Sequence, residues 1–216
     1  IKTLNTDVTY IKSVGEKRKI MLNRLSLYNV WDIIYNFPKD YEDRRTFVKI
    51  CDAKEGERCC IRAILSSFPM QKRIKKNIVL CALPVNDGTG VIFVKWFSNP
   101  KYPVKFDLGA EYIFYGKVTR NFGKLELEML EAERADNAKN VLKIMPVYHL
   151  TKGVTQKFVR DTVKNAFDKF DMFYDIFDDF TRERYSLCSL DFALRQMHFP
   201  SDFETLAKAR ERLVFE

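Results

Sequence analysis

Residues 85–102 read Val85-Asn86-Asp87-Gly88-Thr89-Gly90-Val91-Ile92-Phe93-Val94-Lys95-Trp96-Phe97-Ser98-Asn99-Pro100-Lys101-Tyr102, and this stretch decides the fold. Asn-Asp-Gly predicts a tight turn, because glycine accepts the positive φ that a hairpin turn requires. The strand that follows has alternate faces, one with Val91, Phe93, Lys95 and Phe97 and the other with Ile92, Val94 and Trp96. It ends in aromatic and basic residues, which suit a base stacked beside a phosphate. A core strand closed by an aromatic plug would explain the same pattern.

Period-two patterns and short apolar runs extend over residues 46–148 on both sides of this stretch. They predict strands at Phe47–Ile50, Arg58–Phe68, Ile78–Pro84, Val91–Phe97, Glu111–Thr119, Lys124–Leu130 and Lys143–Pro146, separated by glycine-containing turns. About five strands of a closed sheet within roughly a hundred residues are typical of a small Greek-key barrel of the OB type.

A basic segment, Gln71–Lys76, joins the first two long strands and carries Lys72, Arg73, Lys75 and Lys76. Such a segment is commonly a solvated hairpin tip. Beside an aromatic strand end on an OB barrel, however, it favours a loop that follows a phosphate backbone.

Helical patterns flank the barrel. Ser13–Arg18 predicts a turn that enters a helix, and a second helix runs from about Asn29 until Pro38 stops it. This pair resembles a helix-hairpin-helix, which can hold a DNA phosphate, or is simply a packed helical hairpin. Residues 37–45 alternate in charge, as in a solvated connector. Further helices follow Thr155, a predicted N-cap, and a last one is still amphipathic at Glu216, which suggests a piece of a longer protein.

The predicted fold class is therefore α+β: a five-stranded OB-type Greek-key β-barrel flanked by an N-terminal helical hairpin and a C-terminal helical segment. The predicted parts are a helix-hairpin-helix-like segment at 1–45, an OB-fold domain at 46–148 and a helical linker at 149–216.

Composition narrows the class of partner. The chain has 37 Lys and Arg against 29 Asp and Glu, so its net charge of +8 favours a polyanion such as nucleic acid. Five cysteines without a CxxC pair argue against a zinc cluster and fit a reducing, cytoplasmic setting. No signal peptide and no apolar run of membrane-spanning length is present in the sequence.

Catalytic motifs are missing from the sequence. It has no GxxxxGK[ST] phosphate loop, GxSxG, HExxH or GxGxxG motif. The two histidines, His149 and His198, are interpreted as structural. We therefore predict no catalytic residue, no bound cofactor and no metal, and the function class is a binding module.

Six segments in register resemble the N-terminal region of the bacterial RecG family of ATP-dependent DNA helicases. They are Tyr10–Arg18, Asp32–Arg44, Asn86–Gly90 leading into Trp96 and Phe97, Pro146–Gly153, Met197–Pro200 and Ala209–Glu216. The resemblance implies a DNA repair and recombination helicase that rescues stalled forks, in which this region is the wedge that grips a branch and separates its strands. The ATPase motor, which would use ATP and Mg²⁺, would follow Glu216.

The resemblance also implies partners and a location. The partners are forks, three- and four-way junctions including Holliday junctions, single-stranded DNA at the branch, and a single-strand-binding protein. The expected protein is a monomer in the bacterial cytoplasm, associated with the nucleoid and not with membranes.

By motif match, the aromatic residues that stack on unpaired bases are Phe97 and Tyr102, and Trp96 is a third candidate. The phosphate-binding candidates are Lys72, Arg73, Lys75, Lys76, Lys95 and Lys101. The chain departs from the family pattern by one additional residue between Phe97 and Tyr102, and by Ser13 where glycine is common.

Two alternatives share these features. A general single-strand-binding OB protein would prefer plain single strands to forks. A protein-interaction module would use its basic face on an acidic partner, and neutralising the four cations of the 71–76 segment would then leave DNA affinity unchanged.

Overall fold

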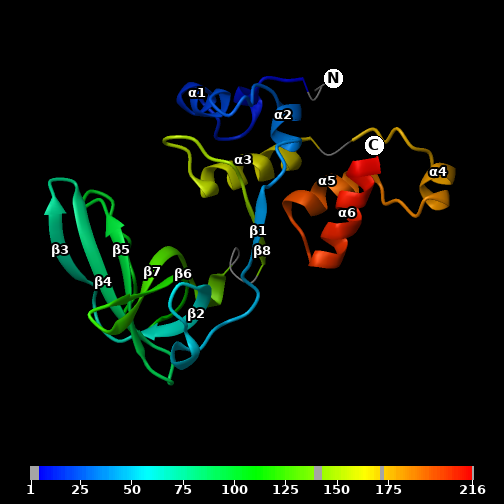
Figure 1. The fold of residues 1–216 in the computed structure, drawn as a ribbon. Coiled ribbons are helices and arrows are strands. Elements are labelled where there is room, and N and C mark those ends of the chain that lie inside the picture. Colours follow the sequence, from blue (N-terminus) through cyan, green and yellow to red (C-terminus); the bar gives the residue numbers. More distant parts are fainter. Residues whose placement is uncertain (1–4, 139–142, 171–172, 216) are drawn as a thin grey trace. The chain divides into compact units, whose positions relative to one another are not determined.

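The computed structural model describes residues 5–138, 143–170 and 173–215, and the chain divides into two compact units (Figure 1). Residues 1–42 and 144–216 form the helical unit, and residues 43–143 form the barrel unit. The two helical segments, predicted as separate parts, share one hydrophobic core, because each has an amphipathic face that must be buried. The chain thus has two units where the sequence predicts three segments.

The helical unit is built from short helices with defined caps. Asn29 begins one of them with a capping box, in which its side chain accepts from Asp32 N while the Asp32 carboxylate accepts from Asn29 N. Thr155 caps another, as predicted, by accepting from Phe158 N. The elements are η1 (Val8–Tyr10), α1 (Glu16–Asn23), α2 (Val30–Ile34), α3 (Gln156–Lys169), α4 (Asp179–Arg184), α5 (Leu190–His198) and α6 (Phe203–Phe215).

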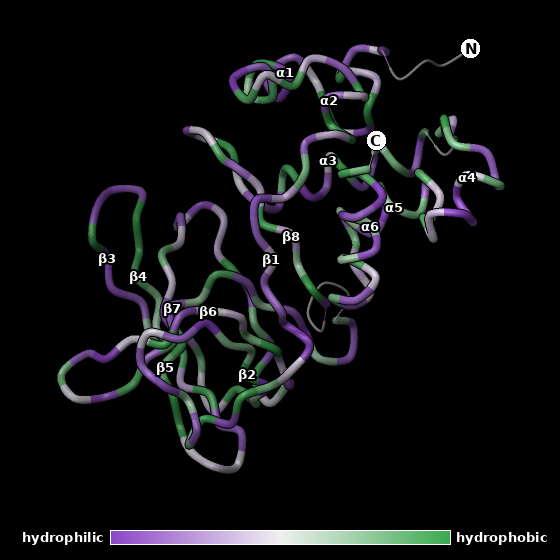
Figure 2. The backbone as a smooth tube through the Cα atoms, turned by 45° about the vertical axis from the view of Figure 1, so that its right-hand side comes forward, coloured by the Kyte–Doolittle hydropathy of each residue, from purple (hydrophilic) through white to green (hydrophobic). Residues whose placement is uncertain are grey.

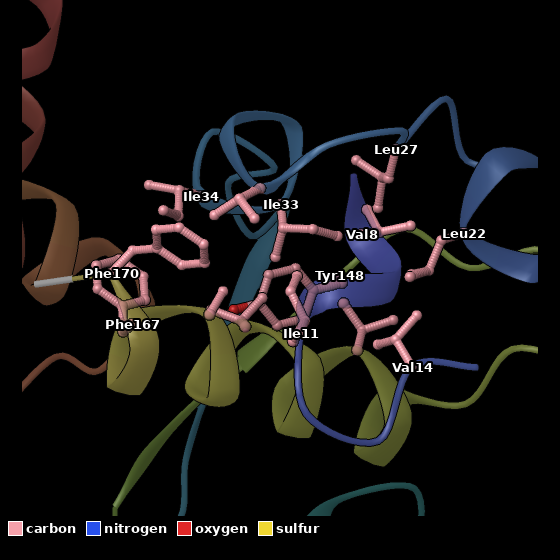
Figure 3. Packing of buried hydrophobic residues seen from close by; sticks show 14 of the residues in the cluster. Val8, Ile11, Val14, Leu22, Leu27, Ile33, Ile34, Tyr148, Phe167 and Phe170 are labelled. Carbon is pink, nitrogen blue, oxygen red and sulfur yellow. The ribbon is translucent and has the colours of Figure 1, made fainter. Parts of the chain in front are cut away.

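Side chains from both ends of the sequence meet in the core of the helical unit. Figure 3 shows Val8 and Ile11 from the N-terminal segment and Ile33 from α2 packed over Phe167 of α3 and Tyr148. His198 is fully buried and lies between the Tyr148 hydroxyl, 2.8 Å from its Nδ1, and the Ile34 carbonyl, 2.7 Å from its Nε2. Since a carbonyl only accepts, Nε2 carries the proton and Nδ1 accepts from Tyr148. This histidine is structural, as predicted.

The barrel unit contains β2 (Arg58–Leu65), β3 (Met70–Lys75), β4 (Ile78–Asn86), β5 (Val91–Ser98), β6 (Glu111–Asn121) and β7 (Lys124–Arg134), with η2 (Ile50–Asp52) and η3 (Ala135–Asn137). The sheet order is β2-β6-β7-β5-β4-β3, and β2 also pairs with β4 at Ile64 and Leu65. This second pairing closes a barrel of β2, β4, β5, β7 and β6, in which only β5 and β7 run parallel. The predicted five-stranded OB-type barrel is confirmed.

The predicted turn before β5 ties this barrel to the preceding segment. Asp87 accepts hydrogen bonds from Ile50 N at 2.8 Å and from the backbone and hydroxyl of Thr89. Burial would raise the pKa of Asp87, but these hydrogen bonds hold it below its usual value. The turn therefore also anchors η2.

Three local predictions, one of a strand, one of a loop and one of a connector, need correction. Phe47–Ile50 is not a strand: Phe47 makes an isolated bridge to Cys60 and Ile50 begins η2. The basic segment is not a loop, because most of it forms β3. Residues predicted as a charged connector form β1 (Asp40–Asp43), which pairs with β8 (Ile144–Val147), so the last predicted strand lies outside the barrel.

Among the described residues, we find no helix with the length and apolar character needed to span a membrane.

Candidate nucleic-acid interface

An exposed two-stranded arm carries the predicted basic residues. Every residue of β3 is exposed, and the strand pairs with β4 from Met70 opposite Ala82 to Lys75 opposite Ile78. Figure 2 shows the contrast between hydrophilic β3 and hydrophobic β4. Arg73 Nη2 donates to the Lys76 carbonyl at 3.1 Å and so braces the turn at the end of the arm. Lys72, Arg73 and Lys75 therefore lie on a defined strand, and Lys76 lies in the hydrogen-bonded turn that follows it.

Strand register brings the basic arm and the aromatic strand end to one face of the sheet. Lys72 lies opposite Leu80, and Leu80 lies opposite Phe97. Residues directly opposite each other point to the same face, and two strand spacings separate Lys72 from Phe97 by about 10 Å. The predicted phosphate contact and the predicted base platform are thus neighbours on this face.

Phe97 and Tyr102 both project into solvent, with 71% and 79% of their surface exposed. A turn joins them: Tyr102 N donates to the Asn99 carbonyl at 2.9 Å, and Lys101 N donates to Asn99 Oδ1 at 3.0 Å. Pro100 occupies a turn position that suits its fixed φ. Tyr102 therefore follows a hydrogen-bonded turn with its ring exposed, and its stacking role stays a prediction.

Trp96 is wrong as a stacking candidate. It is only 7% exposed and packs edge-to-face on Phe106, with ring centroids 5.4 Å apart. The reason is the period of two, which turns Trp96 to the inner face with Ile92 and Val94 while Phe97 turns outward. The expected alternation of β5 is confirmed, and its inner face includes the tryptophan.

Lys95 is already engaged within the barrel unit. Its Nζ lies 2.6 Å from Glu126 Oε1, and both side chains are largely buried. The parallel pairing of β5 with β7 places this carboxylate beside it. Lys95 was predicted to bind phosphate, but its charge is compensated internally. Lys101, in contrast, is exposed beside Tyr102.

Charge is segregated across the sheet. β7 carries Glu126, Glu128, Glu131 and Glu133 on the side of β5 away from the arm. Glu131 pairs with Arg44, whose guanidinium lies 3.6 Å from the centre of the Tyr115 ring. Lys95 and Arg44 compensate Glu126 and Glu131, so the charge that attracts a polyanion is the exposed positive charge on the β3 side of Phe97.

The most exposed aromatic residue in the described part of the chain is not among the candidates that the sequence predicts. Phe122, in the β6–β7 hairpin, is 99% exposed. The sequence shows only Asn121-Phe122-Gly123, which predicts a turn. The feature that could have identified Phe122 in the sequence is an aromatic residue at a turn position that usually holds a small polar one.

The helical hairpin carries a polar groove of mixed charge. Ser13 has a positive φ of 70°, which explains why glycine suits this position. Arg18 donates to its carbonyl and lies over the Phe158 ring. The α3 side of the groove alternates Lys157, Asp161, Lys164 and Asp168. A phosphate site here stays a prediction, since the aspartates offset the lysines.

Comparison with known proteins adds independent findings. Residues 7–169 match the family model of the RecG wedge domain. The chain is 32% identical over 217 residues to the ATP-dependent DNA helicase RecG of Thermotoga maritima, covering 99% of this chain and 28% of that protein. It is 33% identical over 213 residues to the same helicase of Borreliella burgdorferi, covering 95% and 31%.

A solved structure agrees with this. The structure of RecG bound to a three-way DNA junction superposes with a TM-score of 0.83 at 29% identity, covering 99% of this chain and 30% of that one. The chain thus spans about three-tenths of the length of the relatives it matches.

Proposed function

Since this chain belongs to the RecG wedge-domain family, we propose that it recognises branched DNA and holds the strands apart at the branch point. The observation that carries the proposal is the pair of exposed aromatic residues, Phe97 and Tyr102, beside the basic β3 strand. A relative's structure is described as bound to a three-way DNA junction, which supports this class of substrate for the present chain.

The mechanism is physical. Lys72, Arg73, Lys75, Lys76 and Lys101 attract the junction through its phosphates, so affinity falls as salt rises. Phe97 and Tyr102 then stack on bases that have lost their pairing partners, each worth about 1–3 kcal/mol. Opening a base-pair step costs about 1.4 kcal/mol. Two platforms therefore offset the opening without ATP, and recognition follows the shape of the branch.

The parent protein would be an ATP-dependent helicase acting in repair, recombination and fork rescue, as its relatives are ATP-dependent DNA helicases by name. We assign ATP and Mg²⁺ to a motor outside this chain, because the sequence has no GxxxxGK[ST] loop. Forks, Holliday junctions and the single strand at the branch are the proposed substrates. A single-strand-binding protein as partner, a monomeric state and association with the nucleoid complete the proposal.

A gel-shift series at fixed salt tests the substrate. The chain should bind a three-way junction and a fork more tightly than a single strand or a blunt duplex of equal length. Equal affinity for all four would rule out the wedge. Preference for the plain single strand would instead support the general single-strand-binding alternative.

Phe97→Ala tests the residue. We expect the preference for junctions to fall about tenfold, the value of one stack, with the melting temperature unchanged. Tyr174→Ala is the matched control, since Tyr174 is an 89% exposed aromatic of the helical unit. Loss of folding in Phe97→Ala would assign Phe97 to the core.

A further inference from the structure

The β6–β7 hairpin has a strained aromatic residue at its tip. Asn121 pairs with Lys124, so the loop consists of Phe122 and Gly123 alone. Both have positive φ, 46° and 80°, which defines a turn of type I′. Asparagine, aspartate and glycine favour the first of these positions, whereas a bulky side chain is strained there. Strain that folding does not require indicates a functional position.

Phe122 gains nothing from packing that would explain its presence. It is 99% exposed, which makes it the most exposed of the large hydrophobic residues in the described part of the chain. The turn beneath it is nevertheless braced: Arg120 donates from Nη1 to the Gly123 carbonyl at 3.1 Å, and its Nε lies 2.9 Å from Glu55. The ring is therefore presented on a fixed backbone.

Strand register places this tip at the opposite end of β5 from Phe97. β5 and β7 run parallel, with Phe93 opposite Glu126, so Lys124 is level with Val91. Six residues separate Val91 from Phe97, which amounts to about 20 Å along the strand. In an OB barrel, the face between the loop after the first strand and the loop between the last two strands is where oligonucleotides bind.

We propose that Phe122 is a second base-stacking site, which holds an unpaired base of the strand that leaves the branch point. At about 3.4 Å per stacked nucleotide, 20 Å places this base about six nucleotides from the one on Phe97. The exposed Lys124 beside the tip contacts the adjoining phosphate. A single strand crossing the barrel from one platform to the other agrees with the 4–16 nucleotides that one OB fold covers.

This inference rests on the proposed function. Moving a fluorescent base along the unpaired strand gives a separate test of each. Forks carry 2-aminopurine at successive positions one to ten nucleotides from the branch on the unpaired strand, and quenching on binding reports stacking. We expect two maxima, one at the branch and one about six nucleotides away. Phe122→Ala should remove only the distant maximum and weaken binding of long-armed forks about tenfold. A single maximum at the branch overturns this inference alone, and none at either place overturns the proposed function as well.

Phe122→Asn distinguishes binding from folding. Asn-Gly is the favoured pair for this turn, so the variant should melt at a higher temperature than the parent chain and still lose affinity for long-armed forks. Leu108→Ala, another exposed apolar substitution of the barrel unit, should leave affinity unchanged. If Phe122→Asn stabilises the chain and binds every fork as tightly as before, the stacking role is excluded.

Discussion

The helical unit buries most of the charged and polar side chains that are buried in the described residues, whereas the barrel unit exposes its candidate ligand-binding residues. In the helical unit, His198 and Arg212 are fully buried and hold other groups in place. In the barrel unit, Phe97, Tyr102 and the β3 cations face solvent. Arg44 is an exception on the barrel side, where it is buried against Tyr115 and Glu131.

This difference indicates which side chains stabilise the fold and which are available to bind a ligand. Burying a charged group costs free energy unless the group is paired. Removing the partner of a buried charge should therefore destabilise the fold. An exposed ring on a rigid strand contributes little to stability. Substitutions in the helical unit should therefore change stability first, and substitutions on the barrel surface should change DNA affinity first.

The largest effect is expected at the ion pair between Asp175 and Arg212. Arg212 Nη2 lies 2.7 Å from Asp175 Oδ1, and the same carboxylate accepts from the backbone of Phe177 and Leu190. Asp175→Ala leaves a buried guanidinium without this carboxylate, which should lower the free energy of unfolding by about 3 kcal/mol. Urea denaturation measures it. Asp179→Ala, which breaks a surface pair with Arg182, should change it by less than about 1 kcal/mol.

The second largest effect expected is a dependence of folding stability on pH that arises from His198. Burial lowers the pKa of His198 to about 4, although its hydrogen bond to Ile34 opposes the shift. In the unfolded chain the pKa is near 6.5, so between pH 6.5 and 4 the unfolded state binds the additional proton. Stability is complete above pH 6.5 and falls by about 3 kcal/mol as the pH drops to 4.

Thermal melting from pH 7 to 4 checks this expectation, and His198→Gln should flatten the profile. Paired carboxylates contribute mainly at the acid end of this range, near the pKa of about 4 that they have in the unfolded chain, and the comparison with His198→Gln cancels their contribution. Hydrogen bonds to Lys19 and Thr9 lower the pKa of Asp7 to about 2, so most of its contribution is lost at more acid pH. An unchanged profile in His198→Gln would show that another group titrates.

The same contrast explains what sequence could predict. The alternation of β5 and the N-cap at Thr155 follow from local pattern, and both are confirmed. β1 was missed because its alternating charges indicate a solvated connector, whereas Lys39 N donates to Val147 O more than a hundred residues away. β3 was missed because all its residues are exposed, which leaves no burial pattern to read.

The candidate site was predictable to the extent that it depends on exposed side chains. Phe97 and the cations of the arm could be selected from composition and turn signals. The state of Lys95 could not, because its partner Glu126 is brought in by parallel pairing between distant strands. The strain at Phe122 depends on a backbone angle that only the closed hairpin defines.

Substitutions in the basic arm around β3 are expected to have a smaller effect, which changes the free energy of DNA binding but not the stability of the fold. Replacing Lys72, Arg73, Lys75 and Lys76 with glutamine should weaken junction binding about tenfold to a hundredfold at moderate salt, or about 1.4–2.7 kcal/mol. The slope of log affinity against log salt should fall by about one for each lost phosphate contact. Salt titrations of fluorescence anisotropy measure both, with an unchanged melting temperature as the control. Retained DNA affinity would favour the acidic-protein alternative.

The smallest effect on DNA binding is expected at Lys95, whose charge is paired on β5, in contrast to the exposed Lys101 in the turn after β5. Lys95 and Lys101 lie six residues apart, but only Lys95 pairs with a carboxylate at 2.6 Å. Lys95→Gln should therefore leave the salt slope of junction binding nearly unchanged, whereas Lys101→Gln should lower it by up to about one. Glu126→Gln releases the charge of Lys95 and should raise the slope and the affinity slightly. If Lys95→Gln weakens DNA binding as much as Lys101→Gln, the ion pair opens on binding and Lys95 belongs to the interface after all.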